Sequence, residues 1–159
     1  MNLKPIPILA ALVLSAQLPA EAGEGPAYPG GYRLWTHVKS MAIHPGHALA
    51  DPFLGIHHIY ANPAALEGYR SGRFPDGSVI VFDQLQLVNA DDASTEGERV
   101  LVGIMVKDRK RYAATGGWGF QGWAGNSRDQ TLVSDGGAAC YECHTAQAGR
   151  DYVFSTWRD

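Results

Sequence analysis

The chain has 159 residues, of which 45% are hydrophobic and 18% charged, a balance that supports a buried core and excludes an intrinsically disordered chain. A formal charge of −3 offers no positive surface to a phosphate backbone, so nucleic-acid binding is not expected. With 19 glycines and nine prolines the chain is cut into short segments, which disfavours a bundle of long helices.

Residues 1–22 have the three parts of a secretory signal peptide. Lys4 gives a positive start, residues 6–18 form a mostly apolar run, and Ala20-Glu21-Ala22 matches the small-x-small cleavage site. The run is too short to span a bilayer, which takes about 20 apolar residues. We therefore expect cleavage near Ala22, export to the periplasm, no membrane span and one mature domain over residues 23–159; an uncleaved anchor is the alternative.

Turn signals and hydrophobic periodicity divide the mature chain into short elements. In chain order, we expect a short helix or strand over 32–39, a turn over 44–47, a strand over 54–61, a helix over 63–69 with Asn62 as N-cap and Gly72 as its end, a turn over 75–77, a strand over 78–88, a polar loop over 89–98, a strand over 100–106, a turn over 108–110 and a curved strand over 111–121.

The strand expected over 78–88 has two distinct faces. Val79 and Val81 point one way, whereas Ile80, Phe82 and Gln84 point the other. The same alternation places the neighbouring residues of another strand, His57 and His58, on opposite faces. Only one of these two histidines can therefore look into a pocket, and a structural role is expected for both.

Near the carboxyl end, Cys140-Tyr141-Glu142-Cys143-His144 has the C-x-x-C-H form of a c-type haem attachment site. Two thiols at this spacing can bond to the two vinyl groups of one porphyrin, and the adjacent imidazole can reach the iron. A disulfide or a thioredoxin-like redox pair is the alternative, but redox motifs of that kind follow the first strand of a βαβ pattern. We expect one haem c, attached covalently through Cys140 and Cys143, with His144 as the proximal iron ligand.

The position of the motif narrows the class of cytochrome. Small electron-transfer cytochromes take a downstream methionine as sixth ligand, but none follows His144, and Met105 lies in an apolar strand typical of a core. Four-helix cytochromes also carry a late motif, yet the alternation over 78–88 contradicts a bundle. The sequence predicts an α+β fold: a predominantly antiparallel β-sheet with short helices and a C-terminal haem attachment segment near 138–148.

This combination, with several local sequences, resembles the cytochrome P-460 family. The matching stretches, in the family's order, are 32–35, 56–63, 69–78, 140–144 and 151–154. The resemblance implies a homodimer built on an antiparallel sheet. In one branch of the family, enzymes oxidise hydroxylamine and carry a lysine, on the strand after the Pro-Asp-Gly turn, that is joined covalently to the haem. Phe82 stands where that lysine is expected.

The other branch, cytochrome c′-beta, as found in a methane-oxidising bacterium, caps the distal haem face with two phenylalanines. Phe53 and Phe82 match this pair. The resemblance therefore implies pentacoordinate iron and a non-enzymatic protein that binds nitric oxide and carbon monoxide reversibly under the cap, with a redox partner protein as a further candidate partner. The alternatives are an electron-transfer cytochrome and a hydroxylamine-oxidising enzyme with a lysine joined covalently to the haem. The lysines that remain after cleavage are all expected on the surface: Lys39, Lys107 and Lys110.

Overall fold

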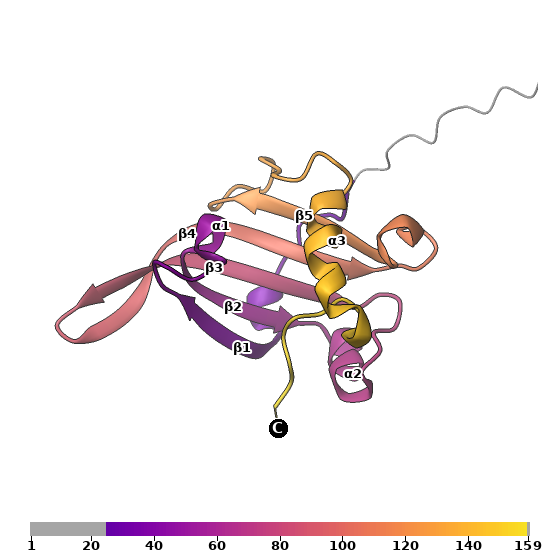
Figure 1. The fold of residues 1–159 in the computed structure, drawn as a ribbon, viewed down its shortest axis with the longest axis horizontal. Coiled ribbons are helices and arrows are strands. Elements are labelled where there is room, and N and C mark those ends of the chain that lie inside the picture. The colour runs from indigo at the N-terminus through magenta and orange to yellow at the C-terminus, as the bar shows by residue number, and fades with distance from the viewer. Residues whose placement is uncertain (1–24, 159) are drawn as a thin grey trace, which may run out of the picture.

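The computed structural model describes residues 25–158. The expected signal peptide, residues 1–22, lies outside this range. Five strands form one antiparallel sheet in chain order: β1 (Thr36–Ile43), β2 (Gly55–Ala61), β3 (Val79–Ala90), β4 (Ala93–Lys107) and β5 (Trp118–Ala124) (Figure 1). The helices are α1 (Ala50–Phe53), α2 (Pro63–Ser71) and α3 (Ala138–His144), with short 3₁₀ turns at Tyr32–Leu34, Ala113–Thr115 and Thr145–Arg150.

This arrangement confirms the predicted α+β fold and excludes a helical bundle. It also resolves the element that the sequence left open, because 32–39 is a 3₁₀ turn followed by the first half of β1. Among the helices of residues 25–158, none is long and apolar enough to cross a membrane.

The helix between β2 and β3 begins and ends where its capping residues predict. The Asn62 side chain accepts a hydrogen bond from the Ala65 amide at 2.9 Å, and Pro63 occupies the first helical turn, where a missing N–H costs nothing. Gly72 ends α2 in the left-handed conformation, with φ of 77°. The same Asn62 oxygen accepts from Val79 at 3.0 Å, so the cap also fixes the start of β3.

The polar loop predicted over 89–98 is wrong. β3 continues to Ala90 and β4 begins at Ala93, so only Asp91 and Asp92 form the turn. Both aspartates have positive φ, 52° and 59°, as a tight two-residue hairpin turn requires. The low hydrophobicity of 89–98 indicates a loop, but a hairpin arm that extends beyond the sheet, as Figure 1 shows, needs no apolar face.

The curved strand predicted over 111–121 also begins too early. A 3₁₀ turn occupies Ala113–Thr115, and β5 starts only at Trp118. Gly116 and Gly117 between them both have positive φ, 65° and 82°, a conformation that a glycine adopts without strain and that a strand cannot continue through. The two glycines therefore belong to the connection that precedes β5 and not to a curved strand.

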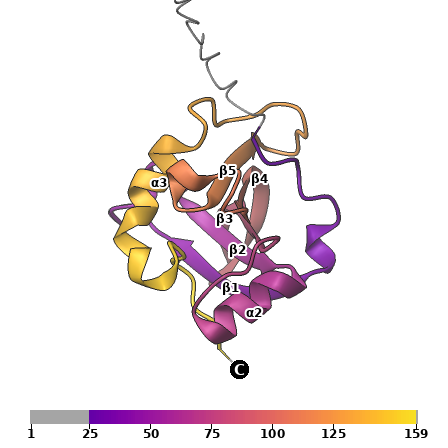
Figure 2. The ribbon, with the colours of Figure 1, turned by 90° about the vertical axis from the view of Figure 1, so that its right-hand side faces the viewer.

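The two faces of the sheet pack against different parts of the chain. One face, which we call the α3 face, lies under α2, α3 and the C-terminal segment, and its buried cluster comprises Val38, Ile59, Ala61, Ala65, Phe74, Ile80, Met105, Trp118, Phe120 and Val153. The other, which we call the N-terminal face, has a smaller cluster of Tyr32, Val81, Val102, Ile104 and Trp123. Figure 2 shows α3 and the N-terminal segment on opposite sides of the sheet. The alternation predicted for β3 is confirmed for Val79–Phe82, whose side chains pack alternately against the two clusters, whereas the pairing of β3 with β4 shifts register around Leu85.

Candidate haem-binding site

The C-x-x-C-H motif forms most of α3. Asp135 precedes this helix, and its carboxylate accepts hydrogen bonds from the amides of Gly137 and Ala139, both at 2.9 Å. These bonds satisfy amides that a helix start leaves without partners, and they hold the pKa of Asp135 below its usual range. In Figure 1, α3 crosses the sheet on its near side.

Both cysteines of the motif are free thiols. Because they are three residues apart on a helix, their side chains lie on the same side, one turn apart. Cys140 is half-buried against the α3-face cluster and Cys143 is exposed. Burial raises the pKa of the Cys140 thiol, and the nearby Asp135 carboxylate adds to this. The structure therefore presents two unpaired thiols on one side of α3 and not the disulfide considered as an alternative.

His144 has a fixed ring orientation. Its Nδ1 lies 2.7 Å from the carbonyl oxygen of Tyr152, which can only accept, so Nδ1 carries the proton and donates it. The ring packs between Phe120 and Phe154, at centroid distances of 5.1 and 5.0 Å. Burial lowers the pKa of His144, which favours the neutral ring. A neutral imidazole held through Nδ1 leaves Nε2 as the nitrogen that can bind a metal.

A buried ion pair ties the segment after α3 to the sheet. The Lys107 ammonium lies 2.6 Å from the Asp151 carboxylate and donates to the Gly116 carbonyl at 3.2 Å. The expectation that Lys107 is a surface residue is wrong, since it is only 4% exposed, with its ammonium over the Trp118 ring. The expectation holds for Lys39 and Lys110, which are exposed. Since Tyr152 follows Asp151, this anchor also fixes the carbonyl that orients His144.

The two phenylalanines expected in the distal cap are in contact. Phe53, the last residue of α1, meets Phe82 of β3 edge to face, with ring centroids 5.4 Å apart. His57 of β2 stacks on Phe82 at 4.4 Å. Phe82 packs against the same buried cluster as Cys140. The structure therefore brings Phe53, Phe82 and the haem attachment segment to one face of the sheet.

Next to these rings lie two buried polar side chains, one on each of the two paired strands β2 and β3. His57 and Gln84 are paired across β2 and β3, and within residues 25–158 neither His57 Nδ1 nor Gln84 Oε1 has a hydrogen-bond partner, although both atoms are buried. Burial, with the neighbouring His58, lowers the pKa of His57 to about 4, so its ring is neutral at pH 7. The strand pairing that joins them is a long-range property that no local pattern reveals.

The sheet surface beside Phe82 is formed by two glycines. Phe82 pairs with Gly103 of β4, which pairs with Gly122 of β5, and directly paired residues point to the same face. A Cβ atom built on Gly103 would lie 3.7 Å from the Phe82 side chain. At this level two adjacent strands contribute no side chain of their own to the α3 face, and we call this strip the floor. The side chains of Leu101 and Leu132 border it, 3.7 Å from a Cβ built on Gly103 and 3.6 Å from one built on Gly122. No local pattern marks either glycine, because their alignment depends on the register of the strands.

The histidine that follows His57 on β2 lies on the opposite face of the sheet. His58, on the N-terminal face, has Nε2 2.6 Å from the Glu96 carboxylate and Nδ1 2.6 Å from the Ser40 hydroxyl. This confirms that successive strand residues face opposite sides and gives His58 a structural hydrogen-bonded role. Three more histidines, in or near turn-rich sequence, are exposed to solvent: His37, His44 and His47.

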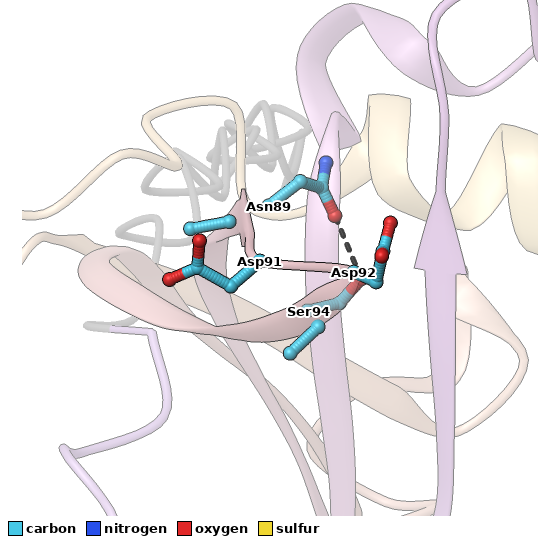
Figure 3. Close-up of a pocket in the computed structure, with 6 residues that line it drawn as sticks. Asn89, Asp91, Asp92 and Ser94 are labelled. Carbon is cyan, nitrogen blue, oxygen red and sulfur yellow. Dashed lines mark hydrogen bonds between the residues drawn. The ribbon is translucent and has the colours of Figure 1, made fainter.

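A surface hollow of about 410 Å³ lies at the tip of the β3–β4 hairpin. It is lined by the turn itself, with the Ser94 hydroxyl donating to the Asn89 side chain at 2.7 Å (Figure 3). Asp91 and Asp92 project from the same turn. The hollow contains no residue of α3 and no aromatic side chain, so it does not contribute to the site built around His144.

No curated protein matches the chain. A model of the cytochrome P-460 family matches residues 29–155, a span that runs from before β1 to beyond α3 and includes Phe53, Phe82, both cysteines and His144. The match covers most of the chain and agrees with the five-stranded antiparallel sheet. The chain therefore belongs to the cytochrome P-460 family, whose members hold a haem cofactor.

Proposed function

We propose that this protein is an exported monohaem c protein that binds nitric oxide reversibly beneath Phe53 and Phe82, as in the cytochrome c′-beta branch. The observation that carries the proposal is the contact between these two rings, 5.4 Å apart, on the face of the sheet that also receives Cys140. No lysine stands at the position of the crosslinking residue, because Phe82 occupies it.

Three features of the chain fit a haem on the α3 face. The thiols of Cys140 and Cys143 are free, Nε2 of His144 is the nitrogen left for iron, and the glycine pair Gly103–Gly122 adds no side chain of its own to the α3 face. A haem held there by Cys140, Cys143 and His144 would supply an iron atom able to bind nitric oxide or carbon monoxide.

The chain's own residues decide which ligands are favoured. Phe53 and Phe82 present no hydrogen-bond donor, so the polar adduct of dioxygen gains nothing from them, whereas nitric oxide and carbon monoxide depend less on a donor. The rings must also move to admit a ligand, since packed interiors contain few voids of molecular size. Ligand affinity is then set by the cost of displacing the rings.

The electron-transfer alternative needs a sixth protein ligand. Met105 is only 8% exposed and packs in the α3-face cluster, paired across the strands with Ile80 and Phe120, which supports a core role. The second alternative, a hydroxylamine-oxidising enzyme, needs a lysine at the haem. Lys107 is held by Asp151, and Lys39 pairs with Ile59, the residue beside Phe82 on β2. Lys39 is therefore the lysine to examine.

Visible spectra of the ferric and dithionite-reduced holoprotein test the proposal. We expect five-coordinate, high-spin spectra in both states and a spectral change on addition of nitric oxide or carbon monoxide. Low-spin, six-coordinate spectra in both states, or no response to either gas, would contradict it. Mass spectrometry of tryptic peptides should find haem on the Cys140–Cys143 peptide alone; a lysine peptide joined to the haem would establish the enzyme instead.

The resemblance supports a homodimer, and the signal sequence over residues 1–22 supports export to the periplasm with cleavage near Ala22. Light scattering of the purified holoprotein should give twice the mass of the chain, and its amino terminus should begin near Gly23. A monomer, or an intact Met1, would contradict these two parts of the proposal without affecting the haem chemistry.

A further inference from the structure

Gln84 links the strand that carries Phe82 to the loop that carries Phe53. Its side chain is fully buried, and its Nε2 donates to the Leu54 carbonyl at 3.0 Å and to the Pro52 carbonyl at 3.4 Å. These two carbonyls stand on either side of Phe53. One amide group on β3 therefore holds both flanks of the residue that forms half of the aromatic pair.

The loop needs such an anchor because its own structure is weak. α1 has only four residues, none of them buried, and Asp51 within it departs from helical dihedral angles. Its backbone bonds, Phe53 to Leu49 and Leu54 to Ala50, complete a single turn, and helices this short are not stable without tertiary contacts. The position of Phe53 therefore depends on contacts from the sheet, among which the Gln84 bonds are the polar ones.

Phe82, in contrast, is held firmly. It lies on β3, the central strand of the sheet, with Ile59 and Gly103 as paired neighbours. His57 stacks on its ring at 4.4 Å. Of the two rings, Phe53 is therefore the one that can move as the loop moves, and Gln84 controls that loop.

The hydrogen bonding of Gln84 supports this assignment. Its Oε1 is buried and has no partner within residues 25–158, which costs free energy that an apolar side chain would not. Compared with an apolar side chain, the glutamine at this position contributes the two hydrogen bonds that it donates to the loop.

We propose that Gln84 is a positioning residue that latches the Phe53 loop onto the sheet and thereby limits the rate at which a diatomic ligand reaches the space beneath Phe53 and Phe82. The proposal rests on the proposed function for its ligand. The latch itself is a property of the chain and can be measured without a ligand.

Hydrogen exchange measures the latch directly. In Gln84→Leu, which keeps the side-chain volume but removes both donors, we expect the amides of Phe53 and Leu54 to exchange about tenfold faster than in the wild-type holoprotein. Gln86→Leu is the matched control, because Gln86 is exposed two residues further along β3 and should leave these amides unchanged. Unchanged exchange in Gln84→Leu would overturn the proposal.

Carbon monoxide association to the reduced holoprotein measures the consequence. We expect the rate constant to rise about tenfold in Gln84→Leu, which corresponds to about 1.4 kcal/mol of barrier, and not to change on adding Gln84→Leu to Phe53→Ala, where no ring remains to be held. Equal increases in both backgrounds, or none in either, would overturn the proposal.

Gln84→Asn, whose shorter side chain cannot span both carbonyls, gives the same test if the leucine variant folds poorly. Wild-type protein that binds neither carbon monoxide nor nitric oxide would refute the proposed function, whereas a wild-type association rate in these variants would refute only the latch.

Discussion

Asp83 and Gln84 are neighbours on β3, both fully buried, and they show how differently the two faces of the sheet treat a polar group. On the N-terminal face, the Asp83 carboxylate accepts hydrogen bonds from Tyr32 at 2.8 Å, Arg99 at 2.7 Å and Arg33 at 3.3 Å. On the α3 face, Gln84 donates twice to a loop and leaves its oxygen without a partner.

The number of hydrogen bonds that satisfy each side chain distinguishes a buried polar group with a structural role, Asp83, from one beside the site, Gln84. A buried charge is stable only when several donors satisfy it, and Asp83 has them. Burial, together with the bond to the Asp83 carboxylate, raises the pKa of Tyr32.

Two buried atoms without a hydrogen bond in the described part of the chain, Gln84 Oε1 and His57 Nδ1, lie beside the two phenylalanines. A third, His58 Nε2, is on the N-terminal face, but it lies 2.6 Å from the Glu96 carboxylate. On β3, Asp83 thus belongs to a structural network on one face of the sheet, and Gln84 belongs to the site on the other face.

The largest expected effect comes from filling the floor of the α3 face. In Gly103→Val, the new side chain would stand beside Phe82 in the space assigned to the haem, so we expect a protein that folds but carries almost no haem. The ratio of haem absorbance to protein measures occupancy, and circular dichroism confirms the fold. Thr95→Val, on the exposed arm of the same strand, is the control. Full haem occupancy in Gly103→Val would contradict the assignment of the floor.

The second prediction concerns the opposite face. Asp83→Ala leaves the Arg99 guanidinium and the Tyr32 hydroxyl without their acceptor, which should lower the free energy of unfolding by about 4 kcal/mol. Urea denaturation of the holoprotein measures it. Because the network lies across the sheet from the site, the fraction that folds should keep the carbon monoxide spectrum of the wild type. If Asp83→Ala altered the carbon monoxide spectrum but left the stability unchanged, Asp83 would belong to the site and not to a structural network, contrary to the comparison of the two faces.

A smaller loss of stability is expected from the buried ion pair of the α3 face. Lys107→Met should cost about 3 kcal/mol, less than Asp83→Ala, because Asp151 is partly exposed and keeps its bond from the Phe74 amide. Since the pair fixes the turn that orients His144, the reduced spectrum should also become heterogeneous. The exposed Lys110→Met is the control. Wild-type stability in Lys107→Met would show that the pair does not anchor the turn.

What the sequence could predict follows from the range of the interactions involved. The Asn62 cap, Gly72 and the alternation of β3 are encoded within a few residues, and each was predicted correctly. The turn at Asp91 and Asp92 was missed because a hairpin arm without a buried face carries no hydrophobic period. The burial of Lys107 was also missed, because its ion-pair partner, Asp151, is 44 residues away in the sequence.

The site divides in the same way. Cys140, Cys143 and His144 form a contiguous motif, and the phenylalanine pair was inferred from family resemblance. The alternation of β3 places Gln84 on the same face as Phe82, but its bonds to the Phe53 loop, the alignment of Gly103 and the Tyr152 carbonyl depend on register or on a turn of the backbone, so no spacing in the sequence points to them.

The smallest predicted effect tests the neutral state of His57. Its pKa of about 4 in the folded protein lies below the value of 6.5 expected when unfolded, so between pH 6.5 and 4 the unfolded chain binds more protons. Stability must therefore fall as the pH is lowered through this window, and the contribution is fully present above it. For a partly exposed ring, screening reduces the effect to about 1.5 kcal/mol.

His57→Phe keeps an aromatic ring against Phe82 but cannot titrate, so its unfolding free energy should vary less with pH over this window than that of the wild type. Urea midpoints measured from pH 7 to pH 4 give both slopes, and their difference removes the contribution of every other group. The exposed His44→Phe variant should retain the wild-type slope. If His57→Phe and the wild type lose stability in parallel, the imidazole beside Phe82 is not held neutral, and the α3 face satisfies its polar groups as fully as the N-terminal face does.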